Sequence, residues 1–366
     1  MFAGELVEPH LWNQFMDYCF GEQMPFVHGW YVAAWSDEVI ADKPLARKIC
    51  GESVVLYRTL DGTAAALEDR CCHRAAPLHL GRVVKEGLQC GYHGLVFNCA
   101  GTCVLIPGQE RIPSTAKVKS FPVVEKNQVV WIWHGPAEAA DESLIIDYPW
   151  HDDPQNWPHK RSMYPVQADY MLLIDNVMDL THIGYLHAAT IGGNPEQHVG
   201  AKMTTTPTPR GVKFVRWLLN SNPPPTYVKA MGFTKNVDRW QEFEFIAPGN
   251  IIQFVGGQEV GKGAYEEDRR DGGFRVRRFH GFTPETETSC FYFWSSANGY
   301  KPSDAQATEQ LFQEIGATLY EDKVMVEAQQ KKLTERGEGG LVGIRSDATR
   351  LAMRRKVAEM LTSQKS

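Results

Sequence analysis

Two cysteine–histidine pairs stand close together in the first third of the chain. They are Cys71-x-His73 and Cys90-x-x-His93, with sixteen residues between them. Two thiolates and two imidazoles could hold a structural zinc ion in tetrahedral geometry. One intervening residue is a tight spacing for two ligands of a single small ion, whereas in a [2Fe–2S] cluster each pair can give its Cys to one iron and its His to the other. We therefore favour the cluster and keep zinc as the alternative.

Histidine ligation would also set the redox behaviour of this centre. Two neutral imidazoles in place of two thiolates raise the reduction potential of a [2Fe–2S] cluster, so it would accept electrons from a low-potential donor. Gly91 and Gly94 flank the second pair and let the backbone approach the sulfurs. Cys72 is expected to be a packed thiol, because two adjacent residues cannot readily both bind one small cluster.

A second group of polar residues lies in "DNVMDLTHIGYLH", residues 175–187. In a helix expected over 169–187, Asn176, Asp179 and His187 share a face with several leucines and isoleucines. Polar side chains on an apolar stripe need partners, because a buried carboxylate without them is costly. Both a hydrogen-bonded core cluster and a metal site meet that need.

A metal site here would be a facial triad, the usual holder of non-haem Fe(II) with open positions for O2. His182 and His187 lie five residues apart and reach one ion only if the helix bends, which Gly184 permits. The third ligand is expected from a later helix, where Asp322 shares the apolar face. Glu321 falls about 100° away on the solvent side. We choose Asp322 and keep Glu321 as the alternative.

The elements that must position these residues divide the chain into an α+β arrangement of two domains. We expect an all-β domain over residues 24–150 and an α+β, helix-grip-like domain with an antiparallel sheet over 151–366. Residues 1–23 are expected to form a short helical extension. The expected strands of the second domain are 213–218, 240–246 and 274–296, its later helices 304–332 and 346–363, and its main loop the Gly- and charge-rich stretch 256–273.

Composition excludes several classes of protein. The chain has 366 residues, 43% of them hydrophobic and 22% charged, as in a globular protein. A net charge of −6 argues against nucleic acid as a partner, and no apolar run approaches the length of a membrane span. Five of the eight cysteines crowd into residues 71–103 among histidines. That usage is typical of metal ligands in a reducing cytoplasm, not of a disulfide scaffold.

The two motifs, in this order and about 90 residues apart, resemble the oxygenase component of Rieske non-haem iron oxygenases. Within that family the chain is similar to the vanillate and dicamba O-demethylases and toluenesulfonate methyl-monooxygenase. The segments that carry this resemblance are "DRCCHRAAPLHLGR", "IPGQERIP", "FTPETETSC" and "YEDKVMVEAQQ". The last resembles the segment with the third iron ligand, which supports Asp322.

The resemblance implies a head-to-tail homotrimer in which His93 of one subunit meets Asp179 of the next. Asp179 would also bond His182, while Asn176 would stay near the iron as a polar neighbour. NAD(P)H would supply electrons through a ferredoxin or flavin reductase. Residues 70–119 carry seven basic side chains against two acidic ones, which suits an acidic electron donor.

The reaction expected from the resemblance is mono-oxygenation of a small aromatic, anionic substrate, by O-demethylation or methyl hydroxylation. His280, Gln253 and Trp294, on neighbouring expected strands, are the candidate substrate contacts, although strand packing would equally explain them. One alternative keeps the family but makes the enzyme a ring-hydroxylating dioxygenase that forms cis-diols. The other, from a different class, is a zinc-stabilised binding module.

Overall fold

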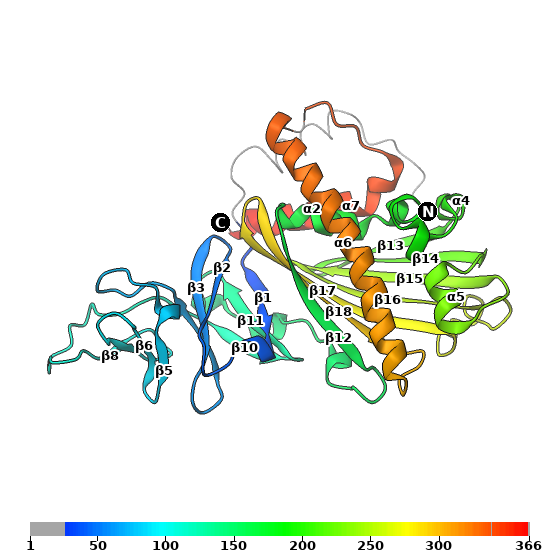
Figure 1. Ribbon diagram of the computed structural model, residues 1–366. Helices are drawn as coiled ribbons and strands as arrows, with labels where there is room; N and C mark the ends of the chain where they lie inside the picture. The colour runs from blue at the N-terminus through cyan, green and yellow to red at the C-terminus, as the bar shows by residue number, and fades with distance from the viewer. Residues whose placement is uncertain (1–25, 338, 365–366) are drawn as a thin grey trace.

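The computed structural model describes residues 26–337 and 339–364. The helical extension expected over residues 1–23 lies outside this part of the chain. Small sheets formed by the N-terminal strands occupy one end of an elongated molecule, and a large sheet covered by helices occupies the other (Figure 1). No helix in the described part is long and apolar enough to cross a membrane.

The N-terminal part is all β, as expected. Its three antiparallel sheets consist of β1 (Gly29–Trp35), β11 (Val129–His134) and β10 (Val123–Lys126); of β2 (Leu45–Ile49), β3 (Glu52–Arg58), β4 (Ala64–Glu68) and β9 (Ser120–Phe121); and of β5 (Arg82–Val84), β6 (Gly87–Gln89), β7 (Val96–Phe97) and β8 (Cys103–Leu105). The first Cys–His pair follows β4, and the second lies in the turn between β6 and β7. Short strands thus hold the two loops that carry the motif.

The C-terminal part is built on one seven-stranded antiparallel sheet, in the order β12-β18-β17-β16-β15-β14-β13. The strands are β12 (His159–Val166), β13 (Lys202–Thr208), β14 (Gly211–Ser221), β15 (Val237–Ile246), β16 (Asn250–Glu259), β17 (Phe274–Thr286) and β18 (Ser289–Asn298). The strand region expected over 274–296 is a hairpin of two strands, β17 and β18. Alternation along these strands puts every second side chain on the face that the helices cover.

The expected start of the loop 256–273 is wrong, because β16 continues through Gly256 and Gly257 to Glu259. At both positions a neighbouring aromatic ring occupies the space that a side chain would need. A Cβ at Gly256 would lie 2.1 Å from the ring of Trp240, and one at Gly257 would lie 3.1 Å from the ring of Tyr227. Glycines that sequence reading takes for a flexible loop therefore serve close packing inside a strand.

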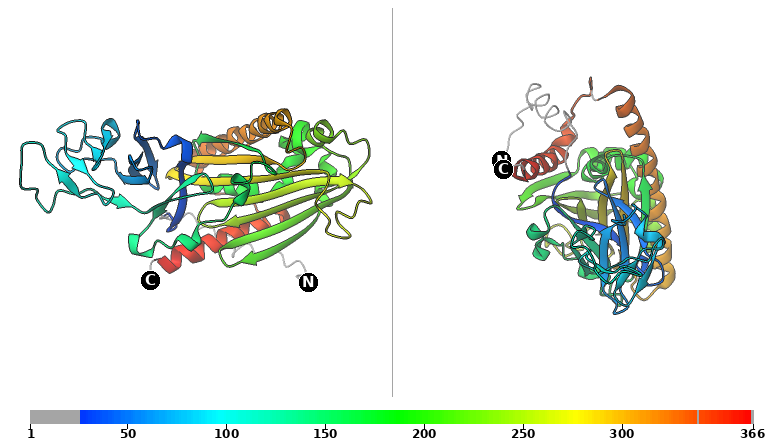
Figure 2. Two further views of the ribbon diagram at one scale, coloured as in Figure 1. Left: turned by 90° about the horizontal axis from the view of Figure 1, so that it is seen from below. Right: turned by 90° about the vertical axis from the view of Figure 1, so that its left-hand side faces the viewer.

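Helices cover one face of the large sheet. They are α2 (Tyr170–Met178), α3 (Ile183–Leu186), α4 (Pro195–Val199), α5 (Pro225–Met231), α6 (Ala305–Arg336) and α7 (Ala348–Gln364). The long helix α6 packs across β12 and β18 and against α2, while α7 lies along β14 (Figures 1 and 2). Leu311, Ile315, Leu319 and Val326 form the buried stripe of α6, and Asp322 falls in the same stripe.

An aromatic core joins the two parts of the molecule. Trp35 of β1 lies edge-on to Phe293 of β18 at 5.7 Å, and Trp131 of β11 lies edge-on to Phe279 of β17 at 6.0 Å between ring centroids. The hydroxyl of Thr283 donates to the carbonyl of Val32 at 2.7 Å. Because such aromatic pairs add to the burial of large apolar surfaces, the small sheets are fixed firmly to the large one.

A buried ion pair ties α7 to α2. Nε of Arg354 donates to both carboxylate oxygens of Asp175, at 2.9 and 3.0 Å, and its Nη2 donates to Oδ2 at 2.5 Å. Arg350 adds a contact of 3.0 Å to the same carboxylate. The Arg354 side chain is only 4% exposed, so this bidentate pair is shielded from solvent. It holds α2 in place directly beside Asn176.

We predict that Arg354→Met lowers the free energy of unfolding by about 3 kcal/mol, because removing one partner strands the other charge in a buried site. Urea unfolding followed by circular dichroism measures the change. The control is Arg350→Met, whose side chain is 20% exposed and which should cost about 1 kcal/mol or less. Equal effects of the two variants would show that α7 does not depend on the buried pair.

Candidate active site

The helix α2 ends abruptly before the two histidines. Asp179, in an extended conformation (φ −121°, ψ 105°), caps its C-terminus and begins the 3-10 turn η6 (Leu180–His182). The Asp179 carboxylate accepts hydrogen bonds from the backbone N–H and the hydroxyl of Thr181, at 2.9 and 2.8 Å. This break, and not Gly184, turns His182 and His187 towards one point. Gly184 is needed because a Cβ there would lie 2.7 Å from the Cα of Pro195 in α4.

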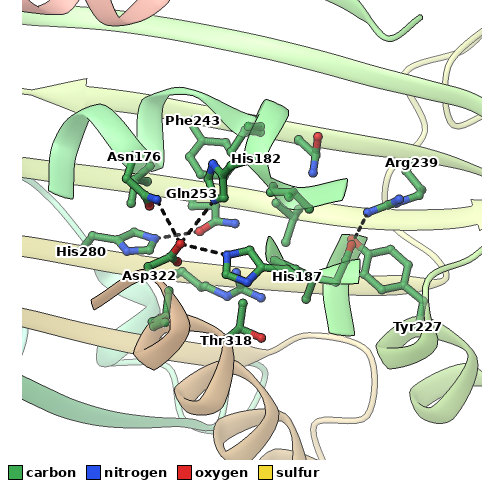
Figure 3. A pocket seen from close by; sticks show the side chains of 18 residues that line it. Asn176, His182, His187, Tyr227, Arg239, Phe243, Gln253, His280, Thr318 and Asp322 are labelled. Carbon is green, nitrogen blue, oxygen red and sulfur yellow. Dashed lines mark hydrogen bonds and ion pairs between the residues drawn. The ribbon is translucent and has the colours of Figure 1, made fainter. Parts of the chain in front are cut away.

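His182, His187 and Asp322 converge, as the sequence predicted. Nε2 of His187 lies 2.9 Å from Oδ1 of Asp322, and Nε2 of His182 lies 3.4 Å from the same oxygen (Figure 3). Within residues 26–337 and 339–364, this is the one group of three His, Cys, Asp or Glu ligand atoms that all lie within 4.8 Å of one another. Three donors therefore face a single point beside the buried stripe of α6.

Asp322 is held in its ionised form. Burial alone would raise the pKa of its carboxyl group, but hydrogen bonds from His182 and His187 lower that pKa to about 2. Burial would lower the pKa of His187, yet Asp322 and Glu321 raise it. Asn176 donates from Nδ2 to Oδ1 of Asp322 at 3.0 Å, which places it beside the triad as expected. Its Oδ1 is buried and has no partner within the described residues.

The second nitrogen of each histidine is also held. Nδ1–H of His182 donates to the backbone carbonyl of Asp179 at 2.6 Å, and Nδ1–H of His187 donates to the carboxylate of Glu321 at 2.7 Å. In the metal-loaded site these contacts would keep the proton on Nδ1 of each ring and leave the lone pair of Nε2 for the metal, as metal-binding histidines require. Asp179 bonds His182 as expected, through its backbone carbonyl. One expectation needs correction: Glu321, although its side chain is 42% exposed, is not simply a solvated charge, because it accepts a hydrogen bond from His187.

The donor set fits a ferrous ion. Two imidazole nitrogens and one carboxylate oxygen on one side of a metal are the ligands of mononuclear non-haem Fe(II) sites, and they leave positions open for O2 and a substrate. The unpartnered Oδ1 of Asn176 adds a polar atom at the edge of the site.

A pocket opens beside the triad. Its apolar walls come from the helices and from β15 and β16, and its polar groups come from the helical segments as well as from the sheet. The lining residues are Asn176, Val177, Leu180, His182, Ile183, His187, Ile191, Tyr227, Arg239, Gln241, Phe243, Gln253, Val255, Arg278, His280, Thr318, Leu319 and Asp322. A pocket that combines apolar walls with this many polar groups suits a small aromatic molecule with polar substituents.

Two of the three expected substrate contacts line this pocket. His280 and Gln253 do, and they bond each other: Nε2–H of His280 donates to Oε1 of Gln253 at 2.7 Å, while the Tyr292 hydroxyl donates to Nδ1 at 2.7 Å. Burial lowers the pKa of His280 to about 3, so the ring is neutral. The expectation for Trp294 is wrong. Its ring stacks on Phe312 of α6, with 5.0 Å between centroids, and is absent from the pocket wall.

The first motif has its two sulfurs inside and its two imidazoles outside. Cys71 and Cys90 are buried, and burial together with the neighbouring Cys90 thiol raises the pKa of Cys71 to about 11. The rings of His73 and His93 are exposed and lie 4.6 Å apart between centroids. No three of these four residues form a group within 4.8 Å. A pair of sulfurs and a separate pair of nitrogens suit the two irons of a cluster better than one zinc ion.

The loops of this motif depend on glycine at two places. Gly94 has φ +77°, a conformation that side chains other than glycine rarely adopt, and its N–H donates to the Cys90 carbonyl at 3.1 Å. A Cβ at Gly91 would lie 2.6 Å from the carbonyl oxygen of Leu80. The loops therefore approach each other by their backbones. The expectation for Cys72 is wrong: this thiol is exposed and not packed.

Comparisons with known proteins agree with both halves of the structure. A family model for the Rieske [2Fe-2S] domain matches residues 29–122, and one for the vanillate O-demethylase oxygenase C-terminal domain matches residues 166–363. The iron–sulfur subunit TsaM1 of a toluene-4-sulfonate monooxygenase system from Comamonas testosteroni is 38% identical over 87% of this chain and 92% of its own length. A vanillate O-demethylase oxygenase subunit from Pseudomonas sp. is 38% identical, over 92% and 95%.

Further matches come from the dicamba enzymes. The oxygenase component of dicamba O-demethylase from Stenotrophomonas maltophilia is 35% identical over 84% of this chain and 89% of its own length. The crystal structure of dicamba monooxygenase bound to 3,6-dichlorosalicylic acid superposes with a TM-score of 0.85 at 30% identity, covering 92% of this chain and 98% of that one. The fold of both parts is thus shared with an enzyme of known structure.

Removing the carboxylate of the triad should abolish metal binding. We predict that Asp322→Ala binds no stoichiometric Fe(II), because two histidines alone leave the site without a charged ligand. Glu321→Gln should keep the ion but bind it about tenfold more weakly, since a neutral amide oxygen replaces the charged acceptor that orients His187. Anaerobic Fe(II) titration measures both. Glu335→Gln, on an exposed turn of α6, is the control, and full affinity in Asp322→Ala would contradict the assignment.

Proposed function

The chain belongs to the Rieske non-haem iron oxygenases as an oxygenase component, and from this premise we propose that it hydroxylates a methyl or methoxy carbon of an aromatic acid. The observation that carries the proposal is the convergence of His182, His187 and Asp322 at the wall of a pocket. Relatives named for toluene-4-sulfonate, vanillate and dicamba support an acidic aromatic substrate.

In this proposal Cys71, His73, Cys90 and His93 hold the [2Fe–2S] cluster, and the triad holds Fe(II). When bound, the cluster stores single electrons and the ferrous ion supplies the reaction with O2. The protein's own groups prepare the site for this. Glu321 and the Asp179 carbonyl hold the protons on Nδ1 of the two histidines, and Asn176 steadies the carboxylate of Asp322.

The overall reaction balances with two electrons. An Ar–CH3 group, O2, two electrons and two protons give Ar–CH2OH and water. With a methoxy group the same insertion gives a hemiacetal, which breaks its C–O bond to release formaldehyde and the phenol. Apolar walls of the pocket, among them Val177, Phe243 and Leu319, exclude bulk water from the reacting carbon.

As an oxygenase component the chain takes electrons from a separate reductase or ferredoxin, a division of labour that the relatives' names as subunits and components also express. We propose a head-to-tail homotrimer for the transfer to iron. The cluster loops lie at the end of the molecule remote from α2 and α6, which supports a route between subunits (Figure 1). Tyr92, 62% exposed beside His93, and Leu80, 69% exposed, offer an apolar rim for that contact.

The other parts of the setting follow from the same proposal. NAD(P)H is the ultimate electron source, and the cytoplasm is the proposed location, which the free thiols among the described cysteines support. Dihydroxylation of the ring to a cis-diol remains the second candidate reaction. The donor set alone fits both reactions, but the relatives with 35–38% identity are named for monooxygenation and demethylation.

Changing the proposed bridge between the two centres should stop turnover without removing metal. Asp179→Asn can still cap η6, because asparagine is as good an N-cap as aspartate. We predict unchanged iron content and a rate of NADH-linked oxygen uptake at least 100-fold lower, since the negative charge between His93 of the partner subunit and His182 is lost. Asp304→Asn, which alters the cap of α6, is the control. Normal turnover in Asp179→Asn would remove the bridge.

A substrate panel tests the reaction class directly. Reductase-coupled assays with methoxybenzoates should release formaldehyde, and toluene-4-sulfonate should give the hydroxymethyl product. Mass spectrometry under labelled O2 should find one labelled oxygen in the hydroxymethyl product. A cis-diol carrying both labelled atoms would favour the dioxygenase instead, and no oxygenated product from any arene would contradict the proposal.

A further inference from the structure

One buried arginine in the pocket has no counterion. Arg278 of β17 is 4% exposed and lines the pocket, and in the described part of the chain its guanidinium has neither a hydrogen bond nor an ion pair. Burial lowers its pKa to about 10, so it keeps its charge at neutral pH. A buried cation without a partner costs several kcal/mol of stability. An unpaired buried guanidinium therefore points to a functional role for its charge.

The other buried arginines near the pocket also lack an ion pair within the described residues, and Nε of Arg239 has no partner, but each donates hydrogen bonds to oxygen atoms of the chain. Arg239 donates to the carbonyl of Ile191 at 2.9 Å and lies 5.1 Å over the ring of Tyr227 (Figure 3). Arg216 donates to the carbonyl of His198 at 2.6 Å and to the amide oxygen of Gln241 at 3.0 Å. Both hold the chain around the triad. Arg278 has no comparable task.

No acidic side chain in the pocket is available to Arg278. Asp322 is the one carboxylate among the lining residues, and its Oδ1 is already shared by His182, His187 and Asn176. In the metal-loaded site this carboxylate would be a ligand. The charge of Arg278 must therefore be matched by something that enters the pocket.

A second donor lies beside Arg278 on the next strand. Gln253 of β16 is its direct partner in the sheet register. Because Oε1 of Gln253 accepts the Nε2–H of His280, which in turn accepts from Tyr292, the amide is fixed in one orientation. That orientation leaves the amide N–H₂ of Gln253 as a donor on a side chain that lines the pocket.

We propose that Arg278, with the amide of Gln253, is the receptor for the acidic group of the substrate. This inference rests on the proposed function and names the residue that selects for an aromatic acid. The planar guanidinium can hold two oxygens of a carboxylate or a sulfonate side by side. His280 and Tyr292 act through Gln253 as positioning residues. His280 was expected to touch the substrate, but both of its nitrogens are already engaged.

Matched acid and amide probes test the receptor. Calorimetric titration of the metal-loaded enzyme uses 4-methoxybenzoate with 4-methoxybenzamide, and toluene-4-sulfonate with toluene-4-sulfonamide. The wild type should bind at least one acid more than tenfold more tightly than its amide, and the pair that shows this identifies carboxylate or sulfonate. Arg278→Gln should weaken that acid about 100-fold and its amide less than threefold. Arg278→Lys should fall between, since it keeps the charge without the fork.

Two further readouts separate a receptor from a structural role. Without ligand, Arg278→Gln should melt at the same temperature as the wild type or higher, because it removes an unmatched buried charge. Arg277→Gln is the matched control: Arg277 precedes it in β17, lies 3.6 Å over the ring of Phe254, and is absent from the pocket wall. It should keep the preference for the acid. Equal losses for acid and amide in Arg278→Gln, or no preference in the wild type, would overturn the receptor.

Turnover recorded in parallel separates this inference from the proposed function. If Arg278→Gln loses the preference for acids but the wild type oxygenates none of the probes, the receptor stands and the proposed reaction falls. If the wild type releases formaldehyde from 4-methoxybenzoate and 4-methoxybenzamide at the same kcat/KM, the reaction stands and the receptor falls.

Discussion

The structure depends on one buried oxygen atom. Oδ1 of Asp322 lies within reach of Asn176, His182 and His187, so three segments of the chain meet at a single carboxylate. Isolated in the interior, that charge would cost several kcal/mol. With donors on every side it is ionised and ready for a cation. The long helix α6 places this carboxylate on the helix-covered face of the sheet, and the break after α2 brings the two histidines to it.

Other features support this meeting point. The ion pair between Arg354 and Asp175 fixes the helix that carries Asn176, and Glu321, the residue before Asp322 in α6, orients His187. The sheet provides the opposite wall, where the unmatched charge of Arg278 faces the space that a substrate would fill. The unpaired charge of Arg278 lowers the stability of the fold, whereas the ion pair between Arg354 and Asp175 raises it. An unpaired positive charge in the wall of the pocket can select an anion without depending on shape alone.

The sequence was most informative where chemistry and periodicity coincide. Asp322 was predicted because it falls in the apolar stripe of α6, and the four residues of the first motif were predicted from their spacing. Contacts between distant segments could not be predicted. Glu321 sits on the solvent side of its helix by any wheel, and only the fold brings His187 to it. Arg278 was not among the predicted site residues, because the sequence pattern does not show whether a buried charge has a partner.

The central claim is that the chain holds two distinct iron centres, and Mössbauer spectroscopy of protein loaded with ⁵⁷Fe tests it most directly. The account predicts a reduced cluster with two inequivalent irons, one bound by sulfur and one by nitrogen, and a separate high-spin ferrous site, in an area ratio of about two to one. Equivalent irons in the cluster, or no mononuclear ferrous component in iron-replete protein, would contradict it.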